Sequence, residues 1–311
     1  MTLQSRKNDA AVDGVLPVDK QEGESSFAVV RQVRRILGVK KAGHAGTLDP
    51  FATGLLVILL GQGTKLSSFL MGGRKRYLAN LRLGCETDTL DLTGQVVRTR
   101  PVPALDPEEV REKTQRFLGE VEQVPPAFSA VKYEGRRAYE LARQGVFMAL
   151  KKRTVTIYRL DVLSLDLPEL TVVVECSGGT YIRSLAADLG EALGAGAHLR
   201  ALRRLSSGSL NVEEAVPMGD LVRETAAAVL MRNVISLKDA LPEVGEYCVD
   251  EEGARRIRNG YQPGLNALAE QGNLCEGRLK VVKGPELVAM AEVVERADKE
   301  GKQLRILRVF H

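Results

Sequence analysis

The stretch "AGHAGTLDPFATGLLVILLGQGTKLS" occupies residues 42–67 and raises the question of what one carboxylate does in a glycine-rich turn. That carboxylate, Asp49, precedes an apolar run at residues 55–60, which is short and β-prone and so predicts a buried strand. Glycine permits tight turns and the close approach of a ligand, and Pro50 favours an extended Asp49 with a fixed side-chain direction. Such a carboxylate can act as a nucleophile or a base, although an aspartate before a proline is more often a turn former. The residues alone leave both roles open.

The composition is that of an ordinary globular protein. The chain has 311 residues, of which 44% are hydrophobic and 27% are charged, and its formal net charge is +4. Four widely separated cysteines and only three histidines argue against a disulfide framework and against a metal site. The polar start "MTLQSRKNDA" is unlike a secretory signal, and no apolar stretch is long enough to cross a bilayer. We therefore expect a cytoplasmic protein with no metal and no membrane association.

The pattern of elements predicts an α+β fold. Residues 25–38 read as an amphipathic helix that begins after Ser25 and ends at Gly38, and residues 106–119 read as a second helix. Strands are expected at residues 76–84 and 171–179, and their irregular alternation with helices favours a mixed, mostly antiparallel sheet. Beyond residue 242, short β-prone segments alternate with glycine turns. We expect a flexible tail at residues 1–11, a large domain at 12–242 and a small β-rich domain at 243–311.

Two basic segments are candidates for binding nucleic acid. The first helix carries Arg31 and Arg34 away from its apolar face, and five basic residues lie between positions 31 and 41 without an acidic one. Residues 124–153 hold seven basic and two acidic residues together with four aromatic rings, which is typical of surfaces that contact phosphates and bases. A charged, solvent-facing helix surface is the alternative for both segments. The candidate RNA-binding residues of the second segment are Lys132, Arg136, Arg137 and Arg143.

Motifs for cofactors are absent from the sequence. There is no G-x-x-x-x-G-K-[ST] phosphate loop, no G-x-G-x-x-G dinucleotide fingerprint after a strand and no H-E-x-x-H zinc motif. We therefore expect no cofactor, and the chemistry has to come from side chains.

Several segments together resemble one family. "AGHAGTLDPFATGLL" closely resembles the signature loop of the TruB family of tRNA pseudouridine-55 synthases. "KRYLANLRLGCETDTLDLTG" at residues 75–94 and "CSGGTYIRSLAADLG" at 176–190 resemble two further motifs of that family. "VPPAFSAVKYEGRRAYELARQG" is similar to the thumb insertion of its stand-alone bacterial members, and the β-rich tail looks like a PUA domain. Together with "GAGAHLRALRRL" from residue 194, the resemblance spans nearly the whole chain in family order.

The resemblance implies roles for particular residues. Asp49 matches the catalytic aspartate, Tyr77 the tyrosine that stacks on the target base, and Arg183 the arginine that pairs with the aspartate. Three further matches are expected to bind the substrate uridine or to rearrange its loop, and these are His44, Tyr181 and Leu202. One departure is visible, because the chain reads "DKQEG" from residue 19 where the family usually has D-K-P-x-G. Gln21 in place of the proline puts the stiffness of this loop in doubt. It does not affect any catalytic role that the resemblance implies.

The resemblance also implies a function: conversion of uridine to pseudouridine in the T-loop of tRNA, after the target base has been flipped out of its stack. The implied partner is the T-stem-loop, gripped by a thumb at residues 124–153, and the implied state is a monomer with no obligatory protein partner. A second interpretation is the guide-RNA-dependent catalytic subunit of box H/ACA particles, which resembles these motifs but lacks the thumb. A third is an RNA-binding or RNA-folding protein that needs no catalysis.

Overall fold

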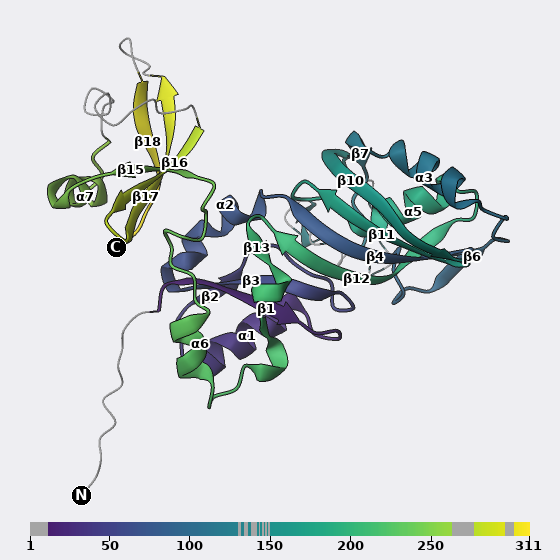
Figure 1. Cartoon of the computed structure of the whole chain (residues 1–311), viewed down its shortest axis with the longest axis horizontal. Coiled ribbons are helices and arrows are strands. Elements are labelled where there is room, and N and C mark those ends of the chain that lie inside the picture. Colours follow the sequence, from purple (N-terminus) through teal and green to yellow (C-terminus); the bar gives the residue numbers. More distant parts are fainter. Residues whose placement is uncertain are drawn as a thin grey trace, which may run out of the picture.

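The computed structural model describes residues 12–129, 132–133, 136–137, 142, 144, 146, 148, 150–262, 277–295 and 302–311. Two sheets dominate it, a ten-stranded sheet and a four-stranded sheet that lies at one end of the molecule (Figure 1). The expected tail at residues 1–11 lies outside the described residues. The α+β prediction with a β-rich C-terminal part is confirmed.

The ten-stranded sheet is mixed and mostly antiparallel. Its order is β14–β1–β3–β12–β4–β11–β10–β7, with β2 beside β3 and β13 beside β12. Only the pairs β1–β14 and β12–β3 are parallel within this sheet. The strands are β1 (Gly14–Lys20), β2 (Ala42–His44), β3 (Thr53–Leu60), β4 (Lys75–Leu83), β7 (Gly119–Gln123), β10 (Arg153–Asp166), β11 (Glu169–Cys176), β12 (Ala197–Ser207), β13 (Leu210–Asn211) and β14 (Val216–Pro217).

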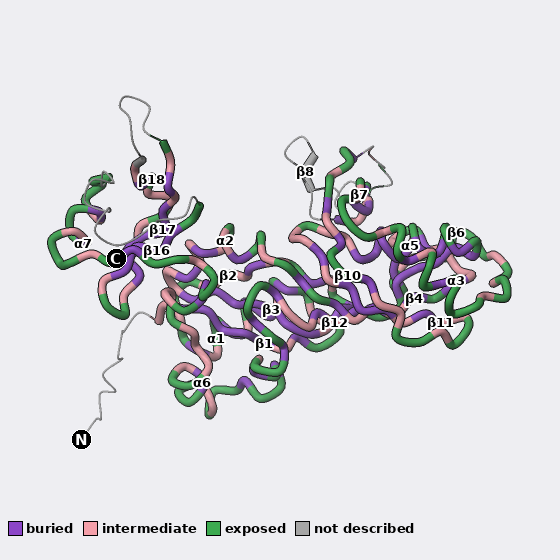
Figure 2. Tube along the Cα trace, turned by 45° about the horizontal axis from the view of Figure 1, so that its top comes forward, coloured by how far each residue is buried: buried purple, intermediate pink, exposed green. Residues whose placement is uncertain are grey.

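Strand β3 explains the unbroken apolar run of the sequence. Its even-numbered residues from 56 to 60 pack into the main hydrophobic core with helix α1, Ser26–Leu37. Its odd-numbered residues from 55 to 59 pack into a second core with η1, Gly61–Leu66, and α2, Ser67–Met71. Both faces of the strand are therefore buried, and no polar alternation is possible (Figure 2). The predicted buried strand is confirmed.

The helices cover separate parts of the large sheet. Helix α1 begins after Ser25, whose side chain accepts a hydrogen bond from the amide of Ala28, and it ends at Gly38 in the left-handed conformation, as predicted. It packs near β2 and α6, Ala226–Arg232. Helices α3, Pro107–Gln115, and α5, Ile182–Ala192, pack on the other half of the sheet, against β10 and β12 (Figure 1). No helix in the described ranges is long and apolar enough to cross a membrane.

The smaller sheet has the order β15–β16–β17–β18 and carries one described helix. Its elements are β15 (Gly245–Cys248), α7 (Glu251–Arg258), β16 (Gly277–Lys283), β17 (Glu286–Glu295) and β18 (Lys302–Val309). It is joined to the large sheet by packing and by hydrogen bonds. Phe310 is buried in the second core behind β3, and the ammonium group of Lys65 donates to the carbonyl of Val309 at 2.8 Å. Contacts with the second core thus anchor the β-rich part.

Two 3-10 helices, η2 (Val212–Glu214) and η3 (Met218–Asp220), follow β13 and β14, and two short hairpins lie outside both sheets. One pairs β5, Cys85–Thr87, with β6, Val96–Thr99, and lies at the end of the large sheet away from the smaller one (Figure 1). The other pairs β8, Lys132–Tyr133, with β9, Arg136–Arg137, inside the predicted thumb. Only the main chain of the second hairpin is described, and Arg143 lies outside the described residues. The proposed RNA contacts of the thumb therefore stay predictions.

Candidate active site

The loop that carries Asp49 is held through its main chain on both sides of that residue. Ser26, the first residue of α1, is buried, and its hydroxyl accepts from the Leu48 amide at 2.8 Å and donates to the Leu48 carbonyl at 2.9 Å. After Asp49, the Pro50 carbonyl accepts from the Gly23 amide at 2.8 Å and from the Lys20 ammonium group at 3.1 Å. These four bonds fix the backbone that presents the carboxylate.

Gly46 has the conformational role predicted for a glycine in this loop. Gly46 has a φ of +99°, in the region that side chains disfavour. The guanidinium group of Arg204, on β12, donates to the carbonyls of Gly46 and Thr47. Asp49 also forms the predicted turn, since its carbonyl accepts from the Ala52 amide at 3.1 Å. The turn role and a side-chain role are therefore compatible.

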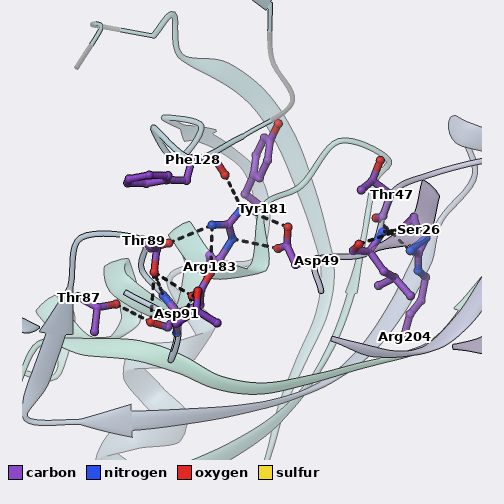
Figure 3. A network of polar contacts seen from close by, with 12 residues as sticks. Ser26, Thr47, Asp49, Thr87, Thr89, Asp91, Phe128, Tyr181, Arg183 and Arg204 are labelled. Atoms are coloured by element: carbon purple, nitrogen blue, oxygen red, sulfur yellow. Dashed lines mark hydrogen bonds and ion pairs between the residues drawn. The ribbon is translucent and has the colours of Figure 1, made fainter. Parts of the chain in front are cut away.

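The Asp49 carboxylate forms an ion pair with Arg183, as the resemblance implied. Arg183 Nε lies 3.0 Å from Asp49 Oδ2, and Arg183 Nη2 lies 3.4 Å from Asp49 Oδ1 (Figure 3). The Arg183 side chain is only 6% exposed, whereas that of Asp49 is 34% exposed. The arrangement leaves the carboxylate accessible while its partner is fixed inside the protein.

Arg183 is fixed by a second carboxylate that sequence analysis missed. Its Nη1 lies 3.1 Å from Oδ2 of Asp91, and both side chains are buried. Asp91 also accepts from the Thr89 hydroxyl at 2.8 Å (Figure 3) and from the Thr93 amide at 2.9 Å. The Phe128 carbonyl accepts from Arg183 Nη2 at 2.9 Å. The threonine- and aspartate-rich segment after β5 was the available signal, but its sequence reads only as a turn.

Burial and charge act in opposite directions on Asp49. Burial raises the pKa of its carboxyl above the ordinary value, Arg183 lowers that pKa, and the neighbouring charge of Asp91 raises it again. The net direction is upward. Arg183 therefore orients the carboxylate and opposes its protonation, as expected, but does not bring its pKa below the ordinary range.

The other predicted pocket residues lie on neighbouring elements. Tyr77 on β4 and Leu202 on β12 are buried in the main core, and burial raises the pKa of Tyr77 to about 12, so its phenol is neutral at physiological pH. Tyr181 directly precedes α5 and is half-buried, and it lies beside the Asp49–Arg183 pair (Figure 3). His44 on β2 is half-buried, and burial lowers its pKa, so this ring is neutral too.

The site offers no arrangement typical of a resident metal. In the described ranges, no three His, Cys, Asp or Glu side chains gather closely enough to bind a metal ion. Cys85 and Cys176 in the same ranges are free thiols. The ionisable groups that act on Asp49 are three cations, which lie on β1, α5 and β12, and the carboxylate of Asp91.

Comparison with known proteins identifies the family. Residues 34–182 match the N-terminal domain of TruB family pseudouridylate synthases, and residues 183–241 match the tRNA pseudouridylate synthase B C-terminal domain. A tRNA pseudouridine synthase B of Syntrophus aciditrophicus is 43% identical over 96% of this chain and 99% of its own length. The chain belongs to the TruB family. A Geobacter sulfurreducens relative with the same name is 41% identical over 96% of this chain and 100% of its own length.

Solved structures agree with the TruB fold. A chain in the crystal structure of a Cbf5–Nop10–Gar1 complex superposes with a TM-score of 0.75, covering 96% of this chain and 85% of that chain. The two sequences are 24% identical, so the likeness concerns the fold. Membership of the TruB family makes this protein a pseudouridine synthase, an isomerase, as the resemblance predicted.

Proposed function

We propose that this TruB protein converts uridine 55 in the T-loop of tRNA to pseudouridine. The observation that carries the proposal is the half-exposed Asp49 carboxylate, held by buried Arg183 in a loop whose backbone is fixed on both sides. Relatives named tRNA pseudouridine synthase B, more than 40% identical over nearly the whole chain, support tRNA as the substrate.

The reaction is an isomerisation, so substrate and product have the same composition. The bond between N1 of uracil and C1′ of the ribose breaks, the base turns, and C5 bonds to C1′. C5 then loses its proton to solvent and N1 gains one, so no oxidant or external group is consumed. Asp49 would act at the sugar, either by attacking C1′ or by removing the 2′ proton to give a glycal.

The surrounding residues would bind the flipped nucleotide. The base has to leave its stack, which costs a few kcal/mol. Tyr77 would form the surface on which the base stacks, and Tyr181 and Leu202 would line the uridine pocket. A neutral His44 would contribute to the rearrangement of the target loop. Arg183 would hold Asp49 in line with the sugar through its bidentate contact.

The RNA surface would extend from the site over α1. Arg31 and Arg34 are exposed on this helix, whose first residue, Ser26, holds the Asp49 loop. Phe27 is 64% exposed, and the guanidinium carbon of Arg31 lies 5.3 Å from the centre of its ring. An exposed ring beside a cation is suited to contact with RNA. We propose that the thumb at residues 124–153 and a PUA-like domain at residues 243–311, beside a catalytic domain at 12–242, add the remaining tRNA contacts.

Tritium release tests the proposed reaction. A tRNA transcript labelled with tritium at C5 of uridine releases the label to solvent when C5 forms its new bond to C1′ of the ribose. The wild-type protein should release tritium, and Asp49→Asn should release none while still binding the transcript. Binding without release by the wild-type protein would instead favour an RNA-binding or RNA-folding role and would refute the isomerase proposal.

A binding experiment tests the α1 surface separately. The double variant Arg31→Ala/Arg34→Ala should bind tRNA more weakly and with a smaller salt dependence, because two phosphate contacts are lost. Arg111→Ala is the matched control, since this exposed arginine lies on α3 and pairs with Glu108. Equal affinity and salt dependence in the double variant and the control would refute the assignment.

The state of the protein in the cell is part of the proposal. We propose a cytoplasmic monomer that acts without an obligatory protein partner or guide RNA. Purified protein that modifies tRNA alone, and that sediments at 33.9 kDa, would support this. Activity that required a guide RNA and added proteins would favour the box H/ACA interpretation instead.

A further inference from the structure

Arg204 is a buried arginine whose charge has no carboxylate partner in the described part of the chain. It lies on β12 and is 0% exposed. Its terminal nitrogens donate only to main-chain carbonyls, and its buried Nε has no hydrogen-bond partner among the described groups. An unpaired buried charge is costly, so a role beyond packing is needed to explain it.

The hydrogen bonds of Arg204 go to the loop that carries Asp49. Both terminal nitrogens lie 3.3 Å from the Gly46 carbonyl. Nη2 also lies 3.1 Å from the carbonyl of Thr47, which Figure 3 shows beside Arg204. These two residues precede Leu48, which Ser26 holds. Arg204 therefore extends the set of main-chain bonds that fix the loop before Asp49.

The sheet is built closely around this arginine. In the register of the strands, Arg204 lies opposite Tyr77 of β4 and opposite Gly54 of β3. A Cβ atom at Gly54 would lie 2.3 Å from the Arg204 carbonyl oxygen, and one at Gly46 would lie 3.2 Å from Arg204 Nη1. The Arg204 guanidinium carbon lies 5.9 Å from the centre of the Tyr77 ring. One side chain thus contacts the loop of Asp49 and the ring proposed to stack on the base.

Charge adds to this geometry. Four ionisable groups from separate elements act on Asp49: Arg183 of α5, Asp91 after β5, Lys20 of β1 and Arg204 of β12. Asp91 favours the protonated form of Asp49, and the three cations favour the ionised form. Arg183 is shared between two carboxylates, whereas Arg204 forms an ion pair with none in the described ranges.

We propose that Arg204 is a positioning residue of the reaction, which sets the Asp49 loop against the face of Tyr77. It acts through those two residues and does not itself touch the substrate. Its unpaired positive charge also helps to keep Asp49 ionised. The inference rests on the proposed function, because it assumes that Asp49 and Tyr77 act on a uridine.

Single-turnover kinetics test the proposal. The enzyme is in saturating excess over the labelled tRNA, so every tRNA molecule is bound by a folded enzyme molecule. The rate constant of tritium release then does not depend on how much of the protein is folded. Arg204→Met should lower this rate about 10²-fold, the effect of a displacement of about 1 Å in a catalytic group. The acidic limb of its pH profile should also move to higher pH, because a cation near Asp49 is lost. Arg204→Lys should lower the rate but keep the acidic limb near the wild-type position.

Arg200→Met is the matched control. Arg200 lies on the same strand, but it is exposed and pairs with Glu169 at 2.6 Å. This variant should keep the wild-type rate and pH profile. If the wild-type protein and this control release no tritium, the proposed function fails, whatever Arg204 does.

Three results would overturn the positioning role while leaving the proposed function intact. The first is an Arg204→Met enzyme with the wild-type single-turnover rate. The second is a lowered rate with an unmoved acidic limb in both Arg204 variants, which would mean that its charge does not act on Asp49. The third is a failure of both variants to fold while the control folds, which would assign Arg204 to the fold alone.

Discussion

Replacing Ser26 by alanine should uncouple the Asp49 loop from helix α1. The serine hydroxyl is bonded to both main-chain groups of Leu48, at 2.8 Å and 2.9 Å, and Ser26 and Leu48 are both buried. Alanine would leave one amide and one carbonyl without a partner inside the protein. Each buried unsatisfied group costs about 1–3 kcal/mol, so we expect Ser26→Ala, which leaves two, to lower the free energy of unfolding by about 2–6 kcal/mol.

The neighbouring Ser25 provides a matched control. Its hydroxyl accepts from the Ala28 amide at 3.2 Å at the exposed start of α1. Loss of such a cap costs about 1 kcal/mol, and among the described residues no hydrogen bond joins the Ser25 hydroxyl to the Asp49 loop. Ser25→Ala should therefore be slightly destabilised and should modify tRNA at the wild-type rate.

Urea unfolding and single-turnover tritium release separate the two effects. Ser26→Ala should be less stable than Ser25→Ala, and its rate at saturating enzyme should fall by about tenfold or more, because the backbone before Asp49 is released. Equal unfolding free energies for the two variants, or a wild-type rate in Ser26→Ala, would refute the reasoning.

The remaining predictions concern ionisable groups. The pKa of Asp49 is raised, so activity that needs its ionised carboxylate should be lost at a higher pH than the one at which an ordinary aspartate is protonated. A pH–rate profile measures this, and activity that persists down to about pH 4 would contradict it. Burial lowers the pKa of Lys75 to about 8, so its unfolded form binds more protons between about pH 8 and 10.5, and folding stability should rise with pH there. Relative to Lys75→Met, the wild-type protein should therefore gain about 2 kcal/mol between pH 7.5 and 9.5 in urea unfolding, and a constant difference would count against burial of a charged lysine. Asp91→Asn should lower the single-turnover rate, since Arg183 loses its buried partner, whereas Asp161→Asn, which alters an ion pair with Arg159 on β10, should not.

Local structure was predictable from the sequence where it depends on residues that are close together in the chain. Ser25 and Gly38 define the ends of α1 because capping and positive φ depend on single residue types. The apolar run at residues 55–60 predicted β3 because a strand covered on both faces needs no polar positions. Asp49, Tyr77 and Arg183 were identified through resemblance, since each lies within its own family motif.

Contacts between distant segments were not predictable in the same way. Asp91 and Arg183 are 92 residues apart, and Asp91 reads as one of several turn residues until the fold brings it to Arg183. Arg204 is one of two adjacent arginines, and only the sheet decides that it points inward while Arg203 pairs with Asp19. The predicted thumb contacts and the role of each pocket residue stay predictions.

Strand β3 has a consequence for the time scales of motion in this enzyme. Its amides lie between two cores, so hydrogen exchange there requires opening of nearly the whole fold. The half-exposed Asp49 lies only four residues before Thr53, where that strand begins. The proposed catalytic group is thus attached directly to a strand whose amides we expect to exchange slowly, and moving its loop requires breaking the loop's bonds to neighbouring elements.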